Sequence, residues 1–400
     1  MRWMVILTLF SQILFHTSVN DVQTSTVLAN VQAEYQYGEV LSVQASYTGS
    51  QNLQNATLDL QTSNKTTYQY PLSATSQGTL FSQIKLGSLT IPPFSRVYYW
   101  FDLTFADGTT YASPAYWFDY LDNRYSWQTN QSKWFNINWV KGNTAYGAGL
   151  QDLALAGLKN ATKVLPISPN LPITIYVYPD AQAAQSILSS TDPDWISGAA
   201  LPQSNLIVVS ASADLNSTQD LERQIPHELT HLLEYQITRE NYSSNPAWLL
   251  EGLATTSETY PNPDYARILQ KAGSTHNLNP MNQLCHAFSP DTQEASLAYA
   301  QSASFVQYLT SRFGTAKIIQ LLQSSGNGLD CSQVESNILG VNLETLDSNW
   351  QAGTFSARSD QNNWMKYWPL LLIVILALAV AIVLRRLFLK KREKENGTYQ

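Results

Sequence analysis

The sequence predicts a chain of several domains: an all-β sandwich, then an α+β domain with a helical C-terminal lobe, then one transmembrane helix. Three observations support this prediction. Residues 21–120 alternate between apolar and polar side chains, which is the pattern of half-buried β-strands. Strand-like and helix-like segments follow one another over residues 128–352. Residues 368–384 form an uncharged run near the C-terminus.

The first domain, residues 21–120, consists of short alternating segments separated by turn residues. Residues 40–47 and 96–103 alternate in this way, and the turn pair Asp107-Gly108 follows the second of them. Several short strands at this spacing are typical of an immunoglobulin-like sandwich. No catalytic pattern lies in this domain. It could act as a spacer, dock a substrate or contact a cell wall, and structural support is the simplest interpretation.

Both ends of the chain carry membrane-targeting patterns. A basic start, a short apolar core and then polar sequence make residues 1–20 a predicted signal peptide, with an uncleaved anchor as the alternative. Residues 353–367 would form a juxtamembrane linker. The run 368–384 is at the short limit for a spanning helix, and the aromatic residues Trp364 and Tyr367 before it suit a membrane interface.

The charges beside the apolar run predict its orientation. Residues 385–400 form a basic tail that begins with Arg385 and Arg386, and such tails stay in the cytoplasm. The protein would then be a single-pass cell-membrane protein with an extracellular N-terminal ectodomain. Residues 21–367 contain 16 Lys and Arg against 28 Asp and Glu, a net charge of −12. A surface that acidic argues against nucleic-acid binding.

A metal-binding motif lies in the second domain. His227, Glu228 and His231 belong to the segment HELTH, which matches the pattern HExxH. Residues four apart lie on one face of a helix, so both imidazoles can bind one ion. Glu251, in the segment WLLEGLA, would be the third ligand of a tetrahedral zinc ion. Glu228 could then take a proton from the water in the open position. The alternative is a structural helix with two surface histidines.

HELTH followed by WLLEGLA resembles the gluzincins, and most closely the peptidase MA-like metallopeptidases of bacteria, which are related to the zinc aminopeptidases. The resemblance covers roughly residues 130–350. It implies a thermolysin-like α+β zincin domain over residues 128–352, with one zinc ion per chain. A zinc-binding domain that has lost catalysis is the alternative, and the retained Glu228 speaks against it.

Two further residues are candidates for the site. The block from Tyr299 to Ala303 resembles the YxKGA helix of the zinc aminopeptidases, so Tyr299 is the candidate donor to the oxyanion of the tetrahedral intermediate. A tyrosine that only packs a helix is the alternative. Glu258, seven residues after Glu251, would share its helical face and orient a ligand, or else be an exposed carboxylate.

One departure from the aminopeptidases concerns specificity. Those enzymes carry a GAMEN segment whose glutamate grips the amino group of the substrate. At a similar distance this chain has the segment from Gly198 to Pro202, which contains no acid. The residue that would bind a free amino terminus is therefore missing from this segment.

The elements expected within residues 128–352 suit a mixed sheet followed by helices. They are a helix over 145–165, a strand over 173–178, a helix over 181–188, a strand over 206–209, the metal-binding helix over 218–238, and mostly helix from residue 264 onward. A proline inside a helix costs about 3 kcal/mol, so the metal-binding helix should begin close to Pro226 or bend there. By the resemblance, the strand 206–209 would be the edge that pairs with a peptide.

The chain has two cysteines, Cys285 and Cys331. Both fall in the predicted ectodomain, where disulfides persist, and the three-ligand set leaves neither a role at the metal. We expect one disulfide between them, with a pair of buried free thiols as the alternative.

Together these patterns predict an extracellular, membrane-anchored zinc peptidase that acts on peptide or protein substrates. A different class of protein is the alternative: a non-catalytic cell-surface binding protein, in which the sandwich binds and the zinc domain is a scaffold. The sequence indicates neither the substrate nor the oligomeric state.

Overall fold

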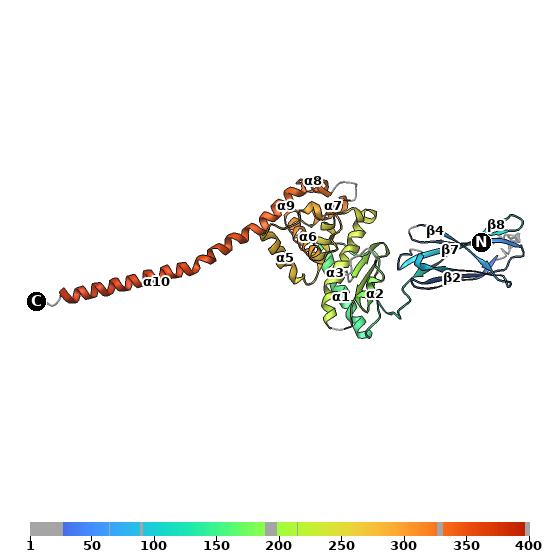
Figure 1. Cartoon of the computed structure of the whole chain (residues 1–400), viewed down its shortest axis with the longest axis horizontal. Coiled ribbons are helices and arrows are strands. Elements are labelled where there is room, and N and C mark those ends of the chain that lie inside the picture. Colours follow the sequence, from blue (N-terminus) through green and yellow to red (C-terminus); the bar gives the residue numbers. More distant parts are fainter. Residues whose placement is uncertain are drawn as a thin grey trace, which may run out of the picture. The chain divides into compact units, whose positions relative to one another are not determined.

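The computed structural model describes residues 27–63, 65–88, 91–188, 198–213, 215–325 and 331–396. The predicted signal peptide, residues 1–20, lies outside the described residues. The chain divides into two compact units, Met1–Tyr125 and Ser126–Gln400 (Figure 1). The first is rich in strands, and the second contains all of the long helices that the structure describes.

The described part of the first unit forms two antiparallel sheets. One has the strand order β1-β2-β6-β5; the other has the order β4-β3-β7-β8, and β9 also pairs with β7. The elements are β1 (Leu28–Gln36), β2 (Val40–Tyr47), β3 (Leu53–Gln61), β4 (Thr67–Pro71), β5 (Ser73–Ala74), β6 (Thr79–Lys85), the 3₁₀ turn η1 (Leu86–Ser88), β7 (Ser95–Phe105), β8 (Thr110–Ala112) and β9 (Tyr116–Tyr120).

Alternation along these strands builds the core of the first unit. Leu41 and Val43 on β2 and Phe101 on β7 are buried, whereas the residues between them face outward. Aromatic rings of the two sheets meet inside, since the ring centroids of Tyr47 and Phe105 lie 6.2 Å apart. Period-two patterns of this kind are what a half-buried antiparallel sheet requires. The predicted strand-rich N-terminal region is confirmed.

The second unit begins with a mixed sheet of order β10-β11-β12-β14-β13. Its strands are β10 (Gln128–Gln131), β11 (Phe135–Trp139), β12 (Ile173–Tyr178), β13 (Gly198–Leu201) and β14 (Leu206–Ser210). The three central strands run parallel, and β10 and β13 pair antiparallel at the two edges. The expectation that residues 206–209 form the edge is therefore wrong, because β13 covers that side of β14.

Helices cover both faces of this sheet. On one face, α1 (Thr144–Val164) and α3 (Leu215–Thr238) pack on Phe135, Ile175 and Val209 in a buried core. Asn143 starts α1, because its side chain accepts a hydrogen bond from the Tyr146 amide at 3.0 Å. The short helix α2 (Ala181–Gln185) lies against β12 and β14. It ends earlier than the predicted segment 181–188.

Helix α3 continues through its proline. It begins at Leu215, so the first of the two expectations for Pro226, a start close to it or a bend there, is wrong. Helix α1 packs closely on the turn of α3 that contains the proline: a Cβ on Gly157 would stand 3.1 Å from Ile225 Cγ2 and 3.2 Å from Pro226 N. Because Gly157 has no side chain, α1 can approach the turn of α3 that contains the proline.

The rest of the second unit is helical, as predicted. Its elements are η2 (Pro202–Ser204), η3 (Arg239–Ser244), α4 (Ala247–Ser257), α5 (Pro263–Ser274), η4 (Met281–Cys285), α6 (Thr292–Phe313), α7 (Thr315–Ser324), α8 (Cys331–Leu339), α9 (Leu343–Gln351), the π-helical turn η5 (Ala352–Ser356) and α10 (Ala357–Asn396). Trp248, Phe305 and Trp350 are fully buried at the centre of this lobe, with edge-to-face ring contacts at 5.1 and 5.7 Å.

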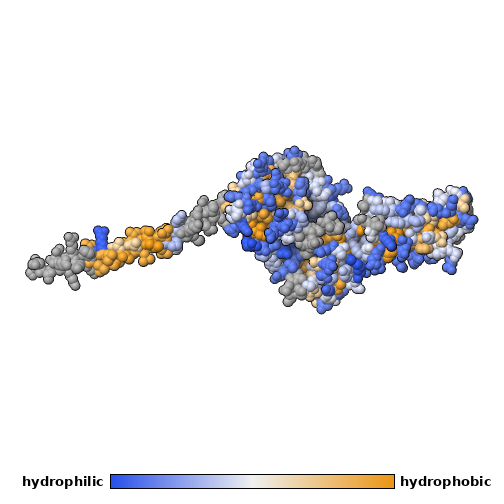
Figure 2. Space-filling view, viewed as in Figure 1, coloured by the Kyte–Doolittle hydropathy of each residue, from blue (hydrophilic) through white to orange (hydrophobic). Residues whose placement is uncertain are grey.

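Helix α10 contains an exposed apolar stretch. Its segment Tyr367–Leu387, 21 residues, is long and apolar enough to cross a membrane, and none of it is buried. Figure 2 shows a hydrophobic band along this helix. Among the described residues no other helix meets that test. The predicted span, residues 368–384, lies inside this segment.

The expected disulfide is present. Cys285, at the end of η4, is bonded to Cys331, at the start of α8, and the two are separated by 46 residues in sequence. The bond joins the segment before α6 to the helix after α7. It closes a loop that includes the whole of α6 and α7.

This loop predicts a stability effect. Replacing Cys285 and Cys331 by serine should lower the free energy of unfolding of the second unit by about 4 kcal/mol, because the open chain gains the entropy of an unclosed loop. Denaturant titration followed by tryptophan fluorescence measures this loss. A non-reduced digest is the independent check: two separately alkylated cysteine peptides, with no linked peptide, would contradict the bond.

Candidate active site

Helices α3 and α4 bring the predicted metal ligands together. His227 and His231 lie one turn apart on α3, and Glu251 lies on α4. Glu251 Oε2 is 3.3 Å from His227 Nε2 and 3.6 Å from His231 Nε2. One ligand atom of each residue lies within 4.8 Å of the others. Among the described residues, this is the one cluster of His, Cys, Asp or Glu that could hold a metal ion.

The spacing of these atoms fits a tetrahedral cation such as zinc. Bonds of about 2.1 Å in a tetrahedron hold the ligand atoms about 3.4 Å apart. Glu251 Oε2 is buried, and its close neighbours are the Nε2 atoms of the two imidazoles. A buried carboxylate needs positive charge nearby. A cation shared with two neutral imidazoles would supply that charge.

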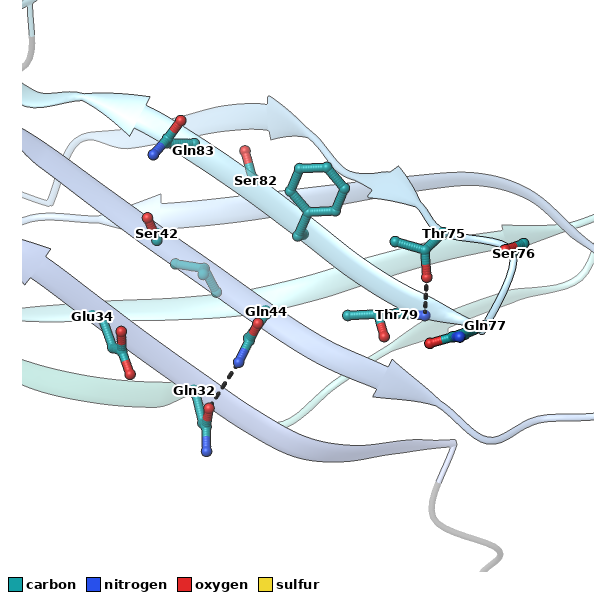
Figure 3. Close-up of a pocket in the computed structure, with 12 residues that line it drawn as sticks. Gln32, Glu34, Ser42, Gln44, Thr75, Ser76, Gln77, Thr79, Ser82 and Gln83 are labelled. Carbon is teal, nitrogen blue, oxygen red and sulfur yellow. Dashed lines mark hydrogen bonds between the residues drawn. The ribbon is translucent and has the colours of Figure 1, made fainter.

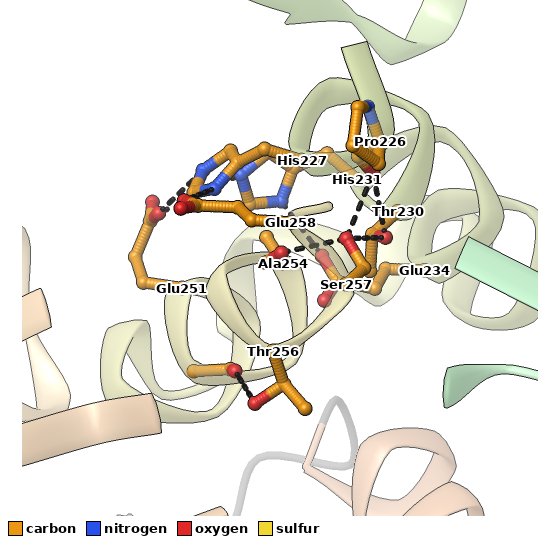
Figure 4. A network of polar contacts seen from close by, with 11 residues as sticks. Pro226, His227, Thr230, His231, Glu234, Glu251, Ala254, Thr256, Ser257 and Glu258 are labelled. Carbon is orange, nitrogen blue, oxygen red and sulfur yellow. Dashed lines mark hydrogen bonds and ion pairs between the residues drawn. The ribbon is translucent and has the colours of Figure 1, made fainter. Parts of the chain in front are cut away.

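The second nitrogen of each imidazole contacts a buried carboxylate (Figure 4). His227 Nδ1 lies 3.1 Å from Glu258 Oε1, and His231 Nδ1 lies 2.8 Å from Glu234 Oε2. A carboxylate that accepts a proton from Nδ1 leaves Nε2 free to face a metal and makes it more basic. Glu258 is buried in this contact, so it is not the exposed carboxylate that the sequence left as an alternative.

Glu234 was not singled out in the sequence. It is fully buried, and its other oxygen, Oε1, has no partner among the described residues. A signal for it existed: Glu234 follows His231 by three residues, and that separation places two side chains on neighbouring positions of a helix surface. The pattern HExxH ends before this residue, which is why the motif did not include it.

A buried hydroxyl pair links the two helices. Ser257 Oγ on α4 donates to the Pro226 carbonyl oxygen at 2.9 Å and lies 2.8 Å from Thr230 Oγ1 on α3 (Figure 4). Pro226 directly precedes the first ligand, so this link lies at the turn that carries the ligand. Both hydroxyls are buried, where hydrogen bonds are directional and costly to lose.

A glycine brings α6 against α4. A Cβ on Gly252 would stand 2.6 Å from the Ser302 carbonyl oxygen and 2.6 Å from Val306 Cγ2. A side chain at this position would therefore push the helices apart. Gly252 directly follows the ligand Glu251, so this contact also sets the distance between the ligand and the residues of α6.

The close contact between α4 and α6 brings Tyr299, on α6, beside the predicted metal ligands. Its ring centroid is 6.1 Å from that of His227, and Phe288 and Tyr265 contact the same ring at 5.1 and 6.5 Å. Burial and the nearby Glu251 carboxylate raise the pKa of Tyr299 well above its usual value. The phenol therefore keeps its proton at neutral pH and can donate a hydrogen bond beside the ligands.

Glu228, which follows His227 on α3, lies near the edge strand β13. It is only 8% exposed, and burial raises the pKa of its carboxyl, although His227 and His231 oppose that rise. The backbone N–H of Ala200, on strand β13, donates to it. The candidate base therefore lies between the ligand helix and the edge strand.

Residues 151–356 match the model of the Peptidase MA superfamily. The matched span is more than half of the chain and contains every site residue described above. The chain belongs to the Peptidase MA superfamily. The predicted resemblance is thereby confirmed at the level of the superfamily. No curated protein matches the chain.

Two solved aminopeptidases are similar to large parts of this superfamily member. An aminopeptidase N family protein from Idiomarina loihiensis has a TM-score of 0.33 and 9% identity, over 79% of this chain and 68% of that one. Aminopeptidase A from Legionella pneumophila, in complex with aspartic acid, has a TM-score of 0.38 and 12% identity, over 80% of this chain and 48% of that one. Both TM-scores lie below 0.5, so the assignment depends on the superfamily match alone.

The charged groups at the site of this Peptidase MA protein shift one another's pKa values. Burial disfavours a charge on His227, but Glu251 and Glu258 outweigh it and raise the pKa of the imidazole to about 10. The pKa of His231 is also raised well above its usual value, despite burial. Burial likewise opposes ionisation of Glu251, and the two histidines nevertheless lower its pKa. The carboxylates around both imidazoles therefore favour their protonated forms.

Glu234 and Tyr242 also belong to the site, although no sequence motif includes either of them. Burial raises the pKa of Glu234 to about 7. Burial also raises the pKa of Tyr242 on η3, which interacts electrostatically with His231, Glu234 and Glu251. Tyr242 lies outside every motif, and only the folded chain brings its phenol beside the ligands.

The raised histidine pKa values predict that zinc binding releases protons. An imidazole must be neutral to bind a metal, and His227, with its pKa near 10, is protonated at neutral pH in the metal-free site. Below that pKa the proton competes with zinc, so the apparent zinc affinity should rise between about pH 6 and pH 9, roughly tenfold per pH unit for each proton released. Calorimetric titration in two buffers of different ionisation enthalpy counts these protons. An affinity that does not change with pH would contradict the protonated site.

Proposed function

We propose that the chain is a zinc-dependent peptidase held at the outer face of a cell membrane. One observation carries this proposal: His227, His231 and Glu251 meet around one point, with Glu228 beside the first ligand. Two imidazoles and one carboxylate are the donor set of catalytic zinc sites that keep one position open. Membership of the Peptidase MA superfamily supports a peptidase.

The side chains around the ligands have the properties that peptide hydrolysis needs. Zinc, when bound, would polarise the scissile carbonyl and acidify the attacking water. Glu228 would accept the proton of that water and deliver it to the leaving amine, and burial makes it the stronger base for this task. Tyr299 would donate to the oxyanion as it develops. Glu234 and Glu258 would hold the imidazoles with Nε2 free.

We also propose a single-pass anchor with the two compact units outside the cell. The apolar segment Tyr367–Leu387 would span the membrane, and the basic tail, residues 385–400, would remain in the cytoplasm. The disulfide between Cys285 and Cys331 supports an oxidising compartment for the second unit. The signal peptide, residues 1–20, would direct export.

Finer statements about the fold are part of the proposal. An immunoglobulin-like sandwich over residues 21–120 is supported by strand order, since β1-β2-β6-β5 follows the A-B-E-D order of that fold and β3 and β7 occupy the opposite sheet. A thermolysin-like zincin domain over residues 128–352 is supported by a mixed sheet followed by helices around the metal ligands. Residues 353–367 would link it to the anchor.

The central test distinguishes the loss of zinc binding from the loss of peptidase activity. The purified protein should contain about one zinc per chain, and Glu228→Gln should keep that zinc but lose peptidase activity by about 10²–10⁴-fold, since it lacks only the base. Elemental analysis and hydrolysis of a quenched fluorescent peptide library measure both quantities.

The matched control is the double variant His227→Ala, His231→Ala, which should lose zinc and activity together. Stoichiometric zinc in that variant would contradict the assignment of His227 and His231 as zinc ligands. A zinc-loaded wild-type protein without any activity would instead favour the non-catalytic surface protein.

Tyr299→Phe removes only a hydroxyl at the site. It should retain zinc and lose about 10²–10³-fold in kcat, with KM little changed, if the hydroxyl donates to the oxyanion. Tyr265→Phe is the matched control, because its ring stacks on Tyr299 and should change kcat only slightly. Near-normal turnover of Tyr299→Phe would leave that residue a packing role only.

The segment from Gly198 to Pro202 predicts the preference for substrate ends. It forms the edge strand β13 and the start of η2, and it contains no acid that could bind a free amino group. Peptides with an acetylated amino terminus should therefore be cleaved at least as fast as the same peptides with a free one. Paired measurements of kcat/KM on both forms decide this, and strict dependence on a free amino terminus would contradict it.

A further inference from the structure

The outward face of sheet β1-β2-β6-β5 carries a pocket that peptide hydrolysis does not use. Its cavity volume is about 470 Å³, and it lies entirely within the first unit (Figure 3). Strands β1, β2 and β6 form its floor. The turn between β5 and β6, with Thr75, Ser76 and Gln77, forms one end of it.

Cross-strand pairing arranges the floor in rows. Gln32 on β1 is opposite Gln44 on β2, and Gln44 is opposite Phe81 on β6. A second row, two residues further along each strand, consists of Glu34, Ser42 and Gln83. Side chains two residues apart project from the same face of a strand, so both rows face the cavity together.

The chemistry of the lining is polar and almost uncharged. Glu34 is the one ionisable residue among those that line the pocket, and most of the others offer carboxamides or hydroxyls. The absence of lysine and arginine from this lining disfavours polyanions, which bind through basic side chains. The centres of protein interfaces are apolar and aromatic, which this floor is not. Neutral donors and acceptors at this density match a ligand that is rich in hydroxyl groups.

One aromatic ring interrupts the polar floor. Phe81 is 45% exposed, and it stands in the same row as Gln32 and Gln44. The face of a phenyl ring carries a partial negative charge. A sugar ring presents polarised C–H groups on one face and hydroxyls around its rim. It could therefore stack on Phe81 while its rim reaches the neighbouring amides.

Two of the polar side chains beside this ring bind each other and have further hydrogen-bonding capacity. Gln44 Nε2 donates to Gln32 Oε1 at 2.8 Å, and the structure describes no other hydrogen bond of these two side chains. Gln44 Oε1 and Gln32 Nε2 thus remain to bind a ligand. The end of the pocket is also held in place, since the Thr79 amide donates to Thr75 Oγ1 at 3.1 Å and the Gly78 amide to the Thr75 carbonyl at 3.0 Å. A preformed site loses less entropy on binding.

We infer that this face binds a neutral glycan, with Phe81 as the stacking surface and Gln32, Gln44 and Gln83 as hydrogen-bonding groups. Nothing in this inference depends on the metal ligands. A glycan site on the first unit would hold the second unit close to proteins on a carbohydrate-rich surface.

The test is direct binding of neutral sugars to the full chain. The protein is kept in a detergent without a sugar head group, with a chelator present so that zinc is irrelevant. Linear hexasaccharides of glucose with α-1,4, β-1,4 and β-1,3 linkages, of mannose, and of N-acetylglucosamine are titrated by calorimetry. At least one should bind saturably, and Phe81→Ala should weaken that binding about tenfold or more, since ring stacking is lost.

Two controls keep the outcome clear. Trp117→Ala removes an aromatic ring that is 54% exposed on β9 of the opposite sheet, and it should leave binding unchanged. Gln44→Ala removes one amide of the central row and should weaken binding without touching the ring. The inference is overturned if no hexasaccharide binds, if Phe81→Ala and Gln44→Ala bind as the wild type does, or if Trp117→Ala alone abolishes binding. Glu228→Gln should bind sugar normally. The sugar-binding result therefore does not depend on whether the protein is a peptidase.

Discussion

The buried contact between α3 and α4 determines where every functional group of the second unit lies. The Pro226 carbonyl and the hydroxyls of Thr230 and Ser257 join the two helices at the turn that precedes the first ligand. On the far side of α4, Gly252 allows α6 to approach within backbone contact and so brings Tyr299 to the ligands. Because these helices are close-packed, a shift of either one would displace the proposed ligands, base and oxyanion donor together.

The same contact concentrates charge in a largely buried site. Four carboxylates and two imidazoles are held there: Glu228, Glu234, Glu251, Glu258, His227 and His231. Each buried charge costs several kcal/mol unless a partner compensates for it. The raised pKa values of the imidazoles favour protons that would provide that compensation, and a divalent cation would provide it when the imidazoles are neutral. Binding of a metal would therefore be linked to proton release and to the stability of this part of the fold.

Much of this protein could be predicted from local patterns in the sequence. The spacing of His227 and His231 depends only on the pitch of a helix, so the folded chain had little freedom to separate them. Alternation likewise predicted the strands of the first unit, and an uncharged run predicted the exposed apolar stretch of α10. Glu251 was expected as the third ligand that a tetrahedral zinc ion needs, whereas Tyr299 was found through resemblance, because it lies far along the chain and no local period connects it to the histidines.

Tertiary structure alone decided the features that depend on distant neighbours. Strand β13, and not β14, forms the edge of the sheet, because the pairing order of strands depends on the path of the whole chain. Helix α3 runs through Pro226, against the preference of the isolated segment, and Gly157 on α1 lets that helix pack closely on this turn. Glu234 and Tyr242 join the site because packing buries them beside the ligands. Helical pitch and strand alternation act over a few residues and are visible in the sequence, whereas burial and pairing arise only when distant segments meet.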